Sequence, residues 1–191
     1  GLFLAELEKF GGYRTRCIAL RLALLTFVRT IELRAAEWPE IDFDRAEWRI
    51  PASRMKMGDP HIVPLSRQSL ALFRELNHLT GNQRWLFPNY RRPETCMTAT
   101  TLNRALERIG FNGREGIGFS AHGFRATAST ILNESGYRSD LIERQLAHQE
   151  RNAVRASYNQ AEYLSDRREM MQFWADLVDQ LADSNSAAVS Q

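Results

Sequence analysis

Four side chains with the chemistry of phosphate transfer lie in one short stretch, between residues 120 and 158. They are His122, Arg125, His148 and Tyr158. Imidazole and guanidinium groups donate hydrogen bonds to phosphate oxygens, and a tyrosine hydroxyl can act as a nucleophile. The stretch is therefore typical of a site at which a tyrosine attacks a phosphate, provided that the four side chains meet in space.

His122 and Arg125 are three residues apart in a predicted helix, so both lie on one face of it. Ser120 can cap that helix. His122 then lies in the first turn, where free N–H groups and the helix dipole favour an anion. The pattern HxxR is also common by chance, so it indicates a phosphate site only together with other residues.

Tyr158 differs from the other tyrosines in its polar neighbours. Arg151 and Arg155 precede it, and Asn159 and Gln160 follow it. A tyrosine among polar side chains is more often accessible than one in an apolar segment. The alternative for any single tyrosine is a half-buried position in the core.

Lys56 is conspicuous because the chain otherwise uses arginine. Of the 25 basic residues only Lys9 and Lys56 are lysines, which leaves 23 arginines. A lysine can give up its proton at physiological pH if its pKa is lowered, whereas an arginine cannot, so a lysine can protonate a leaving oxygen. The alternative is a solvated turn residue. The arginine bias itself suits a phosphate-binding surface, with codon bias as the alternative.

Arg29 follows an apolar helical stretch and has Glu32 three residues downstream. At that spacing the carboxylate can orient the guanidinium. One alternative is a surface ion pair that contributes little to stability. Another is that Arg34, which lies beyond the apolar run, takes the place of Arg29.

The elements that must position these residues are mostly helices. Residues 38–51 alternate and break at Asp44-Arg45, which predicts a β-hairpin. A Gly-Asp-Pro turn then leads into a strand over Ile62–Leu65, with Lys56 at the tip of this second turn. The fold class is therefore mainly α with a small antiparallel β-sheet (α+β). Apolar periodicity and capping residues predict helices over residues 2–10, 14–28, 66–78, 98–109, 121–135, 139–147, 152–158 and 165–181.

Length and composition fit one globular domain. The chain has 191 residues, is 43% hydrophobic and 25% charged, and carries a net charge of +2. We expect a domain over residues 1–182 and a disordered tail over 183–191. Because the chain opens inside a helical pattern without Met, we expect a piece of a longer protein. No apolar run reaches the roughly 20 residues of a membrane span. Cys17 and Cys96 predict two reduced thiols in a cytoplasmic protein.

The motifs occur in an order that resembles a known family. Arg29 opens R-T-I-E-L, Lys56 lies in a turn before H-I-V-P-L, and H-G-F-R, L-A-H and R-A-S-Y-N follow. This order resembles the catalytic domain of the tyrosine recombinases over residues 14–180, and within them the integrases of prophages and genomic islands. The resemblance implies the fold of that domain and a site-specific recombinase that integrates or excises a mobile element.

The resemblance implies a role for each matched side chain. Tyr158 is the nucleophile that attacks a DNA phosphodiester, which leaves a 3′-phosphotyrosyl bond and a free 5′-hydroxyl. Lys56 protonates the leaving 5′-oxygen, and His122 acts as a general base or acid towards the tyrosine. Because the phosphotyrosine stores the bond energy, a new 5′-hydroxyl reseals the strand without ATP.

The remaining matched residues hold the phosphate. Arg29 and Arg125 bind its non-bridging oxygens and stabilise the charge of the transition state. His148 hydrogen-bonds the phosphate, and Glu32 supports Arg29. With two guanidiniums present no metal and no cofactor is required, and the sequence offers no cluster of carboxylates to hold a metal ion.

Double-stranded DNA with attachment sites is the implied substrate. A homotetramer on DNA, with accessory directionality or DNA-bending proteins, is the implied assembly. The implied location is the bacterial cytoplasm, at the nucleoid during action and away from membranes. In the recombinases the last helix can dock on a neighbouring protomer, whereas the simplest packing is on its own domain.

Three other functions are compatible with parts of this pattern. A type IB topoisomerase forms the same 3′-phosphotyrosine but relaxes DNA. A non-catalytic helical DNA-binding protein would use the arginine-rich surface alone and would not need Lys56, His148 and Tyr158 together. A metal-dependent phosphohydrolase is disfavoured because paired acidic ligands are missing.

Overall fold

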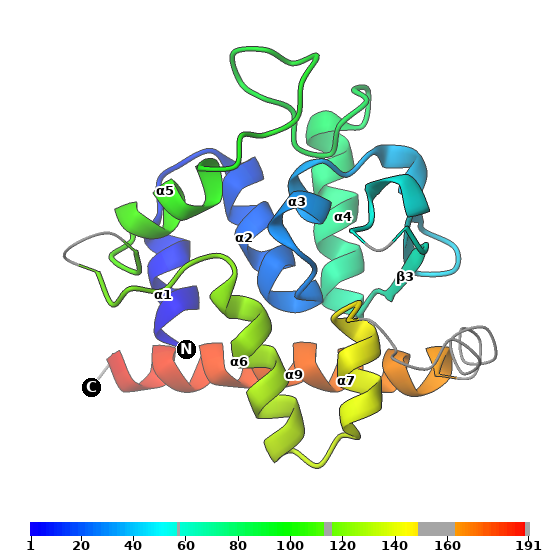
Figure 1. Ribbon diagram of the computed structural model, residues 1–191. Coiled ribbons are helices and arrows are strands. Elements are labelled where there is room, and N and C mark those ends of the chain that lie inside the picture. Colours follow the sequence, from blue (N-terminus) through cyan, green and yellow to red (C-terminus); the bar gives the residue numbers. More distant parts are fainter. Residues whose placement is uncertain (57, 113–115, 149–162, 190–191) are drawn as a thin grey trace.

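The computed structural model describes residues 1–56, 58–112, 116–148 and 163–189 (Figure 1). Tyr158, and with it the helix predicted over 152–158, lies outside the described residues. The fold is mainly helical with one three-stranded antiparallel sheet, as the sequence predicted. The described elements are α1 (Leu2–Lys9), α2 (Arg14–Thr26), α3 (Thr30–Arg34), β1 (Ile41–Asp42), β2 (Glu47–Ile50), β3 (His61–Pro64), α4 (Arg67–Thr80), α5 (Thr101–Arg108), α6 (Gly123–Glu134), α7 (Ser139–Gln145) and α9 (Leu164–Val189).

The sheet has the strand order β1-β2-β3, and its register pairs Ile41 with Trp48 and Ile50 with His61. Trp48 is fully buried on the inner face. The sequence predicted that Lys56 lies at the tip of a turn that joins the second strand to the third. In the structure β2 ends at Ile50, and a 3₁₀ turn over Ala52–Arg54 follows Pro51, whose ring lacks the N–H that a strand ladder needs.

α2 is the central helix, and most of its residues are buried (Figure 1). It packs against α4, α5, α6 and α9, because its alanines and leucines cover most of its circumference. The helix ends at Thr26, two residues before the predicted end. Phe27 then adopts a left-handed conformation, with φ 37°, and reverses the chain so that Arg29 stands directly before α3.

α9 crosses the bottom of the molecule in Figure 1 and packs on its own domain, against α1, α2, α4, α6, α7 and β3. It buries Met170, Trp174 and Val178, and the indole of Trp174 donates to the carbonyl of Leu24 at 2.9 Å. The sequence predicted that this helix ends near residue 181. It continues to Val189, since extending an existing helix orders only one residue for each hydrogen bond gained.

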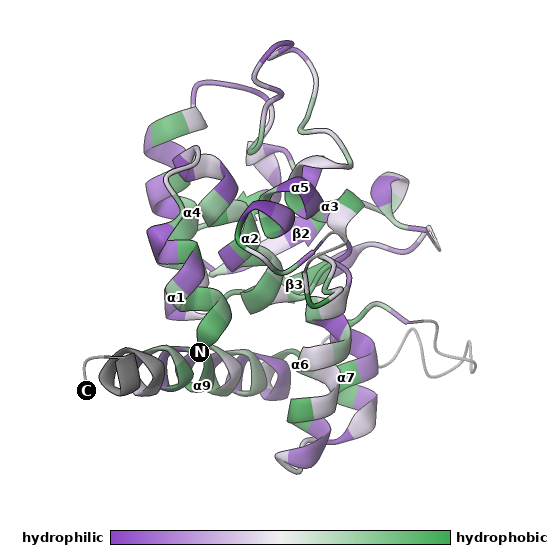
Figure 2. Ribbon diagram, turned by 90° about the vertical axis from the view of Figure 1, so that its left-hand side faces the viewer, coloured by the Kyte–Doolittle hydropathy of each residue, from purple (hydrophilic) through white to green (hydrophobic). Residues whose placement is uncertain are grey.

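α4 begins where the sequence predicted. The hydroxyl of Ser66 accepts a hydrogen bond from the backbone N–H of Ser69 at 3.2 Å and so caps the helix. Figure 2 shows alternating hydrophilic and hydrophobic bands along α4, with Leu72, Phe73 and Leu76 on the buried side. The cap and the apolar stripe are both local sequence signals, which is why this helix could be predicted well.

Candidate active site

Arg29 stands at the junction of α2 and α3 and is held there by Glu32. One carboxylate oxygen of Glu32 accepts from the backbone N–H of Arg29 at 2.8 Å, and the other accepts from Nη1 of Arg29 at 2.7 Å. Glu32 is only 2% exposed. The contact at i+3 is the one that the sequence predicted, and it caps α3 while it orients the guanidinium. Its part in catalysis stays a prediction.

Arg125 lies in the first turn of α6 and is 5% exposed. Its Nη1 donates to the carbonyl of Phe27 at 2.7 Å, and its Nη2 donates to the carbonyl of Leu146, also at 2.7 Å. Burial lowers the pKa of Arg125 to about 10, and the neighbouring charge of Arg29 acts in the same direction. The guanidinium therefore remains charged at neutral pH.

The end of α7 joins these two arginines. Ala147 has a left-handed backbone, with φ 51°, which presents the carbonyls of Leu146 and Ala147 side by side. Nη2 of Arg29 donates to the carbonyl of Ala147 at 3.0 Å, next to the bond from Arg125 to Leu146. Segments far apart in sequence thus meet at one place: the α2–α3 junction, the start of α6 and the end of α7.

His148 completes this group. Its Nε2 lies 3.4 Å from Nη2 of Arg125, and its Nδ1 lies 2.5 Å from a carboxylate oxygen of Glu143. A guanidinium only donates, so the proton of a neutral His148 belongs on Nδ1, where Glu143 accepts it. We call Arg29, Arg125 and His148 the phosphate clamp. The two guanidiniums, which are permanently charged, can hold a phosphate and stabilise the charge that develops on it, and His148 adds a third donor when both of its ring nitrogens carry protons.

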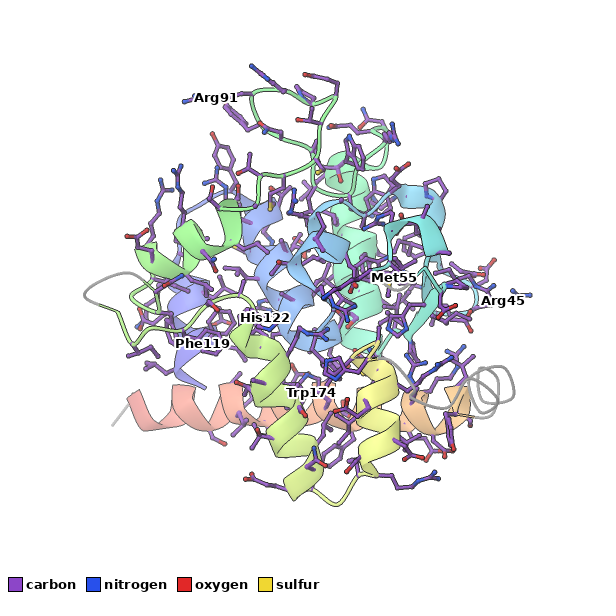
Figure 3. All side chains as sticks on the ribbon, in the orientation of Figure 1. Arg45, Met55, Arg91, Phe119, His122 and Trp174 are labelled. Atoms are coloured by element: carbon purple, nitrogen blue, oxygen red, sulfur yellow. The ribbon has the colours of Figure 1, made fainter. Side chains whose placement is uncertain are left out.

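His122 is exposed and stands at the N-cap position of α6 (Figure 3). The prediction that Ser120 caps this helix and that His122 lies in its first turn is wrong. The ring of Phe119 packs against Phe124 at 5.0 Å, and the carbonyl of Ser120 accepts from the N–H of Gly123. This packing holds the preceding residues in a turn, so the helix begins only at Gly123.

Lys56 is exposed in the connection between β2 and β3. The base of that connection is anchored by Arg54, which donates to the carboxylate of Glu40 and to the backbone carbonyl of Glu32. No local pattern pointed to Arg54, because its partners belong to other elements. Through Glu32 the connection is tied to the residue that also holds Arg29.

The structure therefore brings together only part of the predicted set. Arg29, Arg125 and His148 are linked through shared contacts, with Glu32 behind them. Within the described part of the chain, the side chains of Lys56 and His122 make no hydrogen bond to this group. Tyr158 lies outside the described residues.

A second polar group behind the clamp was missed by sequence reasoning. Gln145 is fully buried, and its side-chain oxygen accepts from Nε of Arg167 at 3.1 Å and from Nη2 of Arg167 at 2.6 Å. Its backbone carbonyl lies 3.1 Å from Nε2 of His61, which is 6% exposed. Burial, and then the charge of Arg167, lower the pKa of His61 to about 3. His61 is therefore neutral at physiological pH.

Neither a metal site nor a membrane span is found among the described residues. No three His, Cys, Asp or Glu side chains gather in those ranges in a way that could hold a metal ion. None of the helices described is long and apolar enough to cross a lipid bilayer.

Comparison with known proteins places this geometry in a family context. The model of the family described as "Phage integrase family" matches residues 3–164. The prophage integrase IntA of Escherichia coli K12 is 46% identical over 176 residues, which cover 92% of this chain and 41% of that protein. The integrase of enterobacteria phage P4 is 45% identical over 191 residues, which cover 93% and 43%. The chain thus spans about two fifths of the length of these relatives.

Solved structures agree on the fold. The integrase from mycobacterium phage Brujita superposes with a TM-score of 0.65 at 17% identity, covering 88% of this chain and 54% of that one. The Tn1549 transposon integrase, in complex with transposon right end DNA, superposes with a TM-score of 0.59 at 15% identity, covering 85% and 63%. At such low identity these likenesses bear on the fold alone.

Proposed function

The chain belongs to the phage integrase family of tyrosine recombinases, and on that footing we propose that it is the catalytic domain of a site-specific DNA recombinase. In this proposal it cleaves and rejoins double-stranded DNA and thereby integrates or excises a mobile element. The observation that carries the proposal is the phosphate clamp. Arg29 and Arg125 are 96 positions apart in the numbering, yet they are held on the adjacent carbonyls of Ala147 and Leu146.

The proposed reaction begins with Tyr158. Its phenolic oxygen attacks the phosphorus of a phosphodiester, a new phosphorus–oxygen bond to the tyrosine forms, and the bond to the 5′-oxygen breaks. Lys56 gives its proton to the departing 5′-oxygen, and His122 takes the proton of the phenol. Attack of a second 5′-hydroxyl on the phosphotyrosine reverses these steps, so joining needs no ATP.

The clamp carries the electrostatic part of the proposal. In the pentacovalent transition state, negative charge grows on the two non-bridging oxygens, which the guanidiniums of Arg29 and Arg125 stabilise. His148 donates from Nε2 when the imidazole carries both protons, with the proton of Nδ1 held by Glu143. Glu32 supports the fixed position of Arg29 from behind.

A covalent adduct tests the nucleophile. With a nicked suicide duplex that carries the crossover site, the cut strand diffuses away and the protein remains linked to DNA. We expect the adduct to disappear in Tyr158→Phe and to persist in Tyr163→Phe. Tyr163 is the matched control, since the guanidinium of Arg138 lies over its ring at 5.2 Å and accounts for its position. Loss of the adduct in Tyr163→Phe alone would assign the nucleophile elsewhere.

Lys56 has its own test. A 5′-bridging phosphorothiolate leaves as a thiolate and needs no proton from the protein. Cleavage of this substrate by Lys56→Ala should therefore return to the rate of the unchanged chain, while cleavage of the ordinary phosphodiester stays slow. A variant that is equally slow on both substrates rules out the general-acid role.

The assembly is part of the same proposal. A homotetramer on paired attachment sites, with accessory directionality or DNA-bending proteins, acts in the bacterial cytoplasm at the nucleoid. The Tn1549 transposon integrase, solved in complex with transposon right end DNA, supports a DNA substrate for this chain. Recombination between two attachment sites, and not relaxation of supercoiled plasmid, is the expected activity. Relaxation without joining would instead favour use as a type IB topoisomerase.

A further inference from the structure

A separate cavity lies beside the phosphate clamp, between the sheet and the ends of α7 and α9. Its volume is about 210 Å³, and its polar lining comes from Arg49 on β2, His61 on β3, Arg144 on α7 and Arg167 on α9. None of the clamp residues lines it. Figure 1 shows β3, α7 and the first turns of α9 drawn close together at this place, in agreement with the contacts of α9 to β3 and to α7.

Arg167 is the deepest of these groups, at 3% exposed. Among the described residues its bonds go to neutral acceptors only: the side-chain oxygen of Gln145 at 2.6 Å and the backbone carbonyl of Ile62 at 2.6 Å. Both bonds come from Nη2, with a further one from Nε to Gln145, so Nη1 is not used by any acceptor of the described residues. Burial lowers the pKa of Arg167 to about 9, and the charge of Arg144 adds to this.

The other cations do not balance this charge. Arg144 is half-buried in the last turn of α7 and forms no ion pair with the described residues. Arg49 is paired with Glu47, but that carboxylate also binds Arg168. Among the described residues, three guanidiniums therefore line the cavity, and the one carboxylate paired with any of them, that of Glu47, is shared with an arginine outside the lining. Bringing like charges together costs free energy that an anion between them would return.

The pKa of His61 reflects the same excess of positive charge. Besides burial, the charges of Arg167, Arg144 and Arg29 all lower its pKa. Its Nε2–H is taken by the carbonyl of Gln145, so the neutral ring lines the cavity without a second proton to donate.

We infer that this cavity is a second phosphate site, distinct from the clamp, in which Arg144 and Arg167 hold a phosphate group beside His61. The assignment of that phosphate group to DNA rests on the proposed function. The cavity adjoins the clamp through consecutive residues, since Gln145 precedes the Leu146 that binds Arg125. It adjoins the Lys56 connection through Pro60 and His61. A DNA strand with one phosphate in the clamp then has a further phosphate over the cavity.

Inorganic phosphate tests the site without DNA. In histidine NMR spectra at constant pH, phosphate should shift the resonances of His61 through the cavity and those of His148 through the clamp, each with its own affinity. Arg144→Met should weaken the effect at His61 about tenfold, the worth of one charge-assisted hydrogen bond pair. Arg144→Lys should restore part of it.

The matched control is Arg138→Met. This arginine also belongs to the α7 region, but its side chain is 58% exposed and paired with Asp140. It should leave the phosphate effect at His61 unchanged. If phosphate shifts His148 and not His61, or if Arg138→Met weakens the effect as much as Arg144→Met, the second site does not exist.

DNA is the second arm. The logarithm of duplex affinity falls linearly with the logarithm of salt concentration, by about 0.9 for each phosphate neutralised. Arg144→Met should reduce that slope by about one phosphate, whereas Arg138→Met should not change it. If the slope of Arg144→Met equals that of the unchanged chain and phosphate still shifts the resonances of His61, the site binds free phosphate and not DNA. If the slope is unchanged and phosphate causes no shift at His61, the inference is overturned. Neither result touches the Tyr158 adduct, so the proposed function stands or falls separately.

Discussion

Arg29 and Arg125 differ from Lys56 and His122 in how the fold holds them. Both arginines donate to backbone carbonyls at 2.7 to 3.0 Å, and Glu32 fixes Arg29 a second time. Lys56 and His122 are exposed and stand at the edge of an element, on a strand connection and at a helix N-cap. The two pairs share one proposed reaction but not one structural environment.

The difference follows from what each pair must do. Charge stabilisation works best when the dipoles and charges are fixed before the reaction, because no reorganisation is then needed. A proton donor or acceptor must also reach solvent to recover its proton after each step. We therefore expect variants of Arg29 and Arg125 to lose activity and stability together, and variants of the exposed pair, Lys56 and His122, to lose activity alone.

Arg125→Lys should have the largest effect. A lysine keeps the charge but cannot donate to the carbonyls of Phe27 and Leu146 and to a phosphate at the same time. Single-turnover formation of the covalent adduct should fall about 10³-fold, and the unfolding free energy in urea should fall as well. Arg138→Lys, an exposed arginine near α7, is the control and should change neither. A loss of activity below tenfold would mean that the fixed geometry is not what the site uses.

His122→Asn should have the second largest effect, and it should lower the rate of adduct formation without lowering the unfolding free energy. A general acid or base contributes roughly 10²-fold or more to rate, so adduct formation should fall about 10²-fold. Because the imidazole is exposed, the unfolding free energy should stay within about 0.5 kcal/mol. His78→Asn, exposed on α4, should leave both unchanged. If His122→Asn lowers stability as much as Arg125→Lys does, the division between fixed and exposed residues fails.

Glu32→Gln should have a smaller effect on rate, of about tenfold, because Arg29 keeps its bond to the carbonyl of Ala147. The carboxylate is 2% exposed, and its loss weakens an ion pair and a helix cap at once. The unfolding free energy should fall by about 1–3 kcal/mol. Since Glu32 acts through Arg29, the rate at saturating DNA should fall while the affinity for DNA stays the same.

Glu37→Gln is the matched control, because Glu37 pairs with the exposed Arg84 at 2.8 Å. Glu32→Asp, which retains the charge on a shorter side chain, should recover part of the rate. Weaker DNA binding in Glu32→Gln, without a slower rate at saturation, would remove the positioning role and leave only a structural one.

Local patterns explain which parts of this site could be predicted from the sequence. The contact between Arg29 and Glu32 spans three residues, and the Ser66 cap spans three, so periodicity and capping rules reach both. The hairpin was predictable for the same reason. The separate helix α3 was not, because R-T-I-E-L continues the helical pattern and only the left-handed Phe27 divides it from α2.

Contacts between distant segments explain what the sequence could not predict. The bonds of Arg125 span 98 residues to Phe27 and 21 to Leu146, and no spacing rule gives them. The start of α6 was wrong because a tertiary contact of Phe119 outweighs the capping preference of Ser120. Gln145 and Arg167 were missed because a buried arginine with neutral acceptors has no sequence signature, and only the packing of α9 against α7 brings the two residues together.

The smallest expected effect is on the pH dependence of stability, and it concerns His61, behind the clamp. It tests whether burial keeps this imidazole neutral in the folded protein. The folded pKa is about 3 and the ordinary value is 6.5. Between these pH values His61 binds a proton in the unfolded chain but not in the folded chain. Its contribution to the unfolding free energy is therefore fully present above pH 6.5 and is lost as the pH falls towards 3. The contribution of His61 is about 1 kcal/mol for each pH unit in that window.

His61→Gln keeps a donor for the carbonyl of Gln145 and has no group that titrates there. Urea unfolding at pH 7 and pH 5 should therefore show a smaller loss of stability for this variant than for the unchanged chain. His78→Gln, on the exposed face of α4, should retain the full loss. An equal loss in all three would mean that His61 takes up a proton in the folded state. The arginines of the cavity would then disfavour the protonated form of His61 less than their number implies. The groups behind the clamp would also be held in a less fixed environment than Arg29 and Arg125 within it.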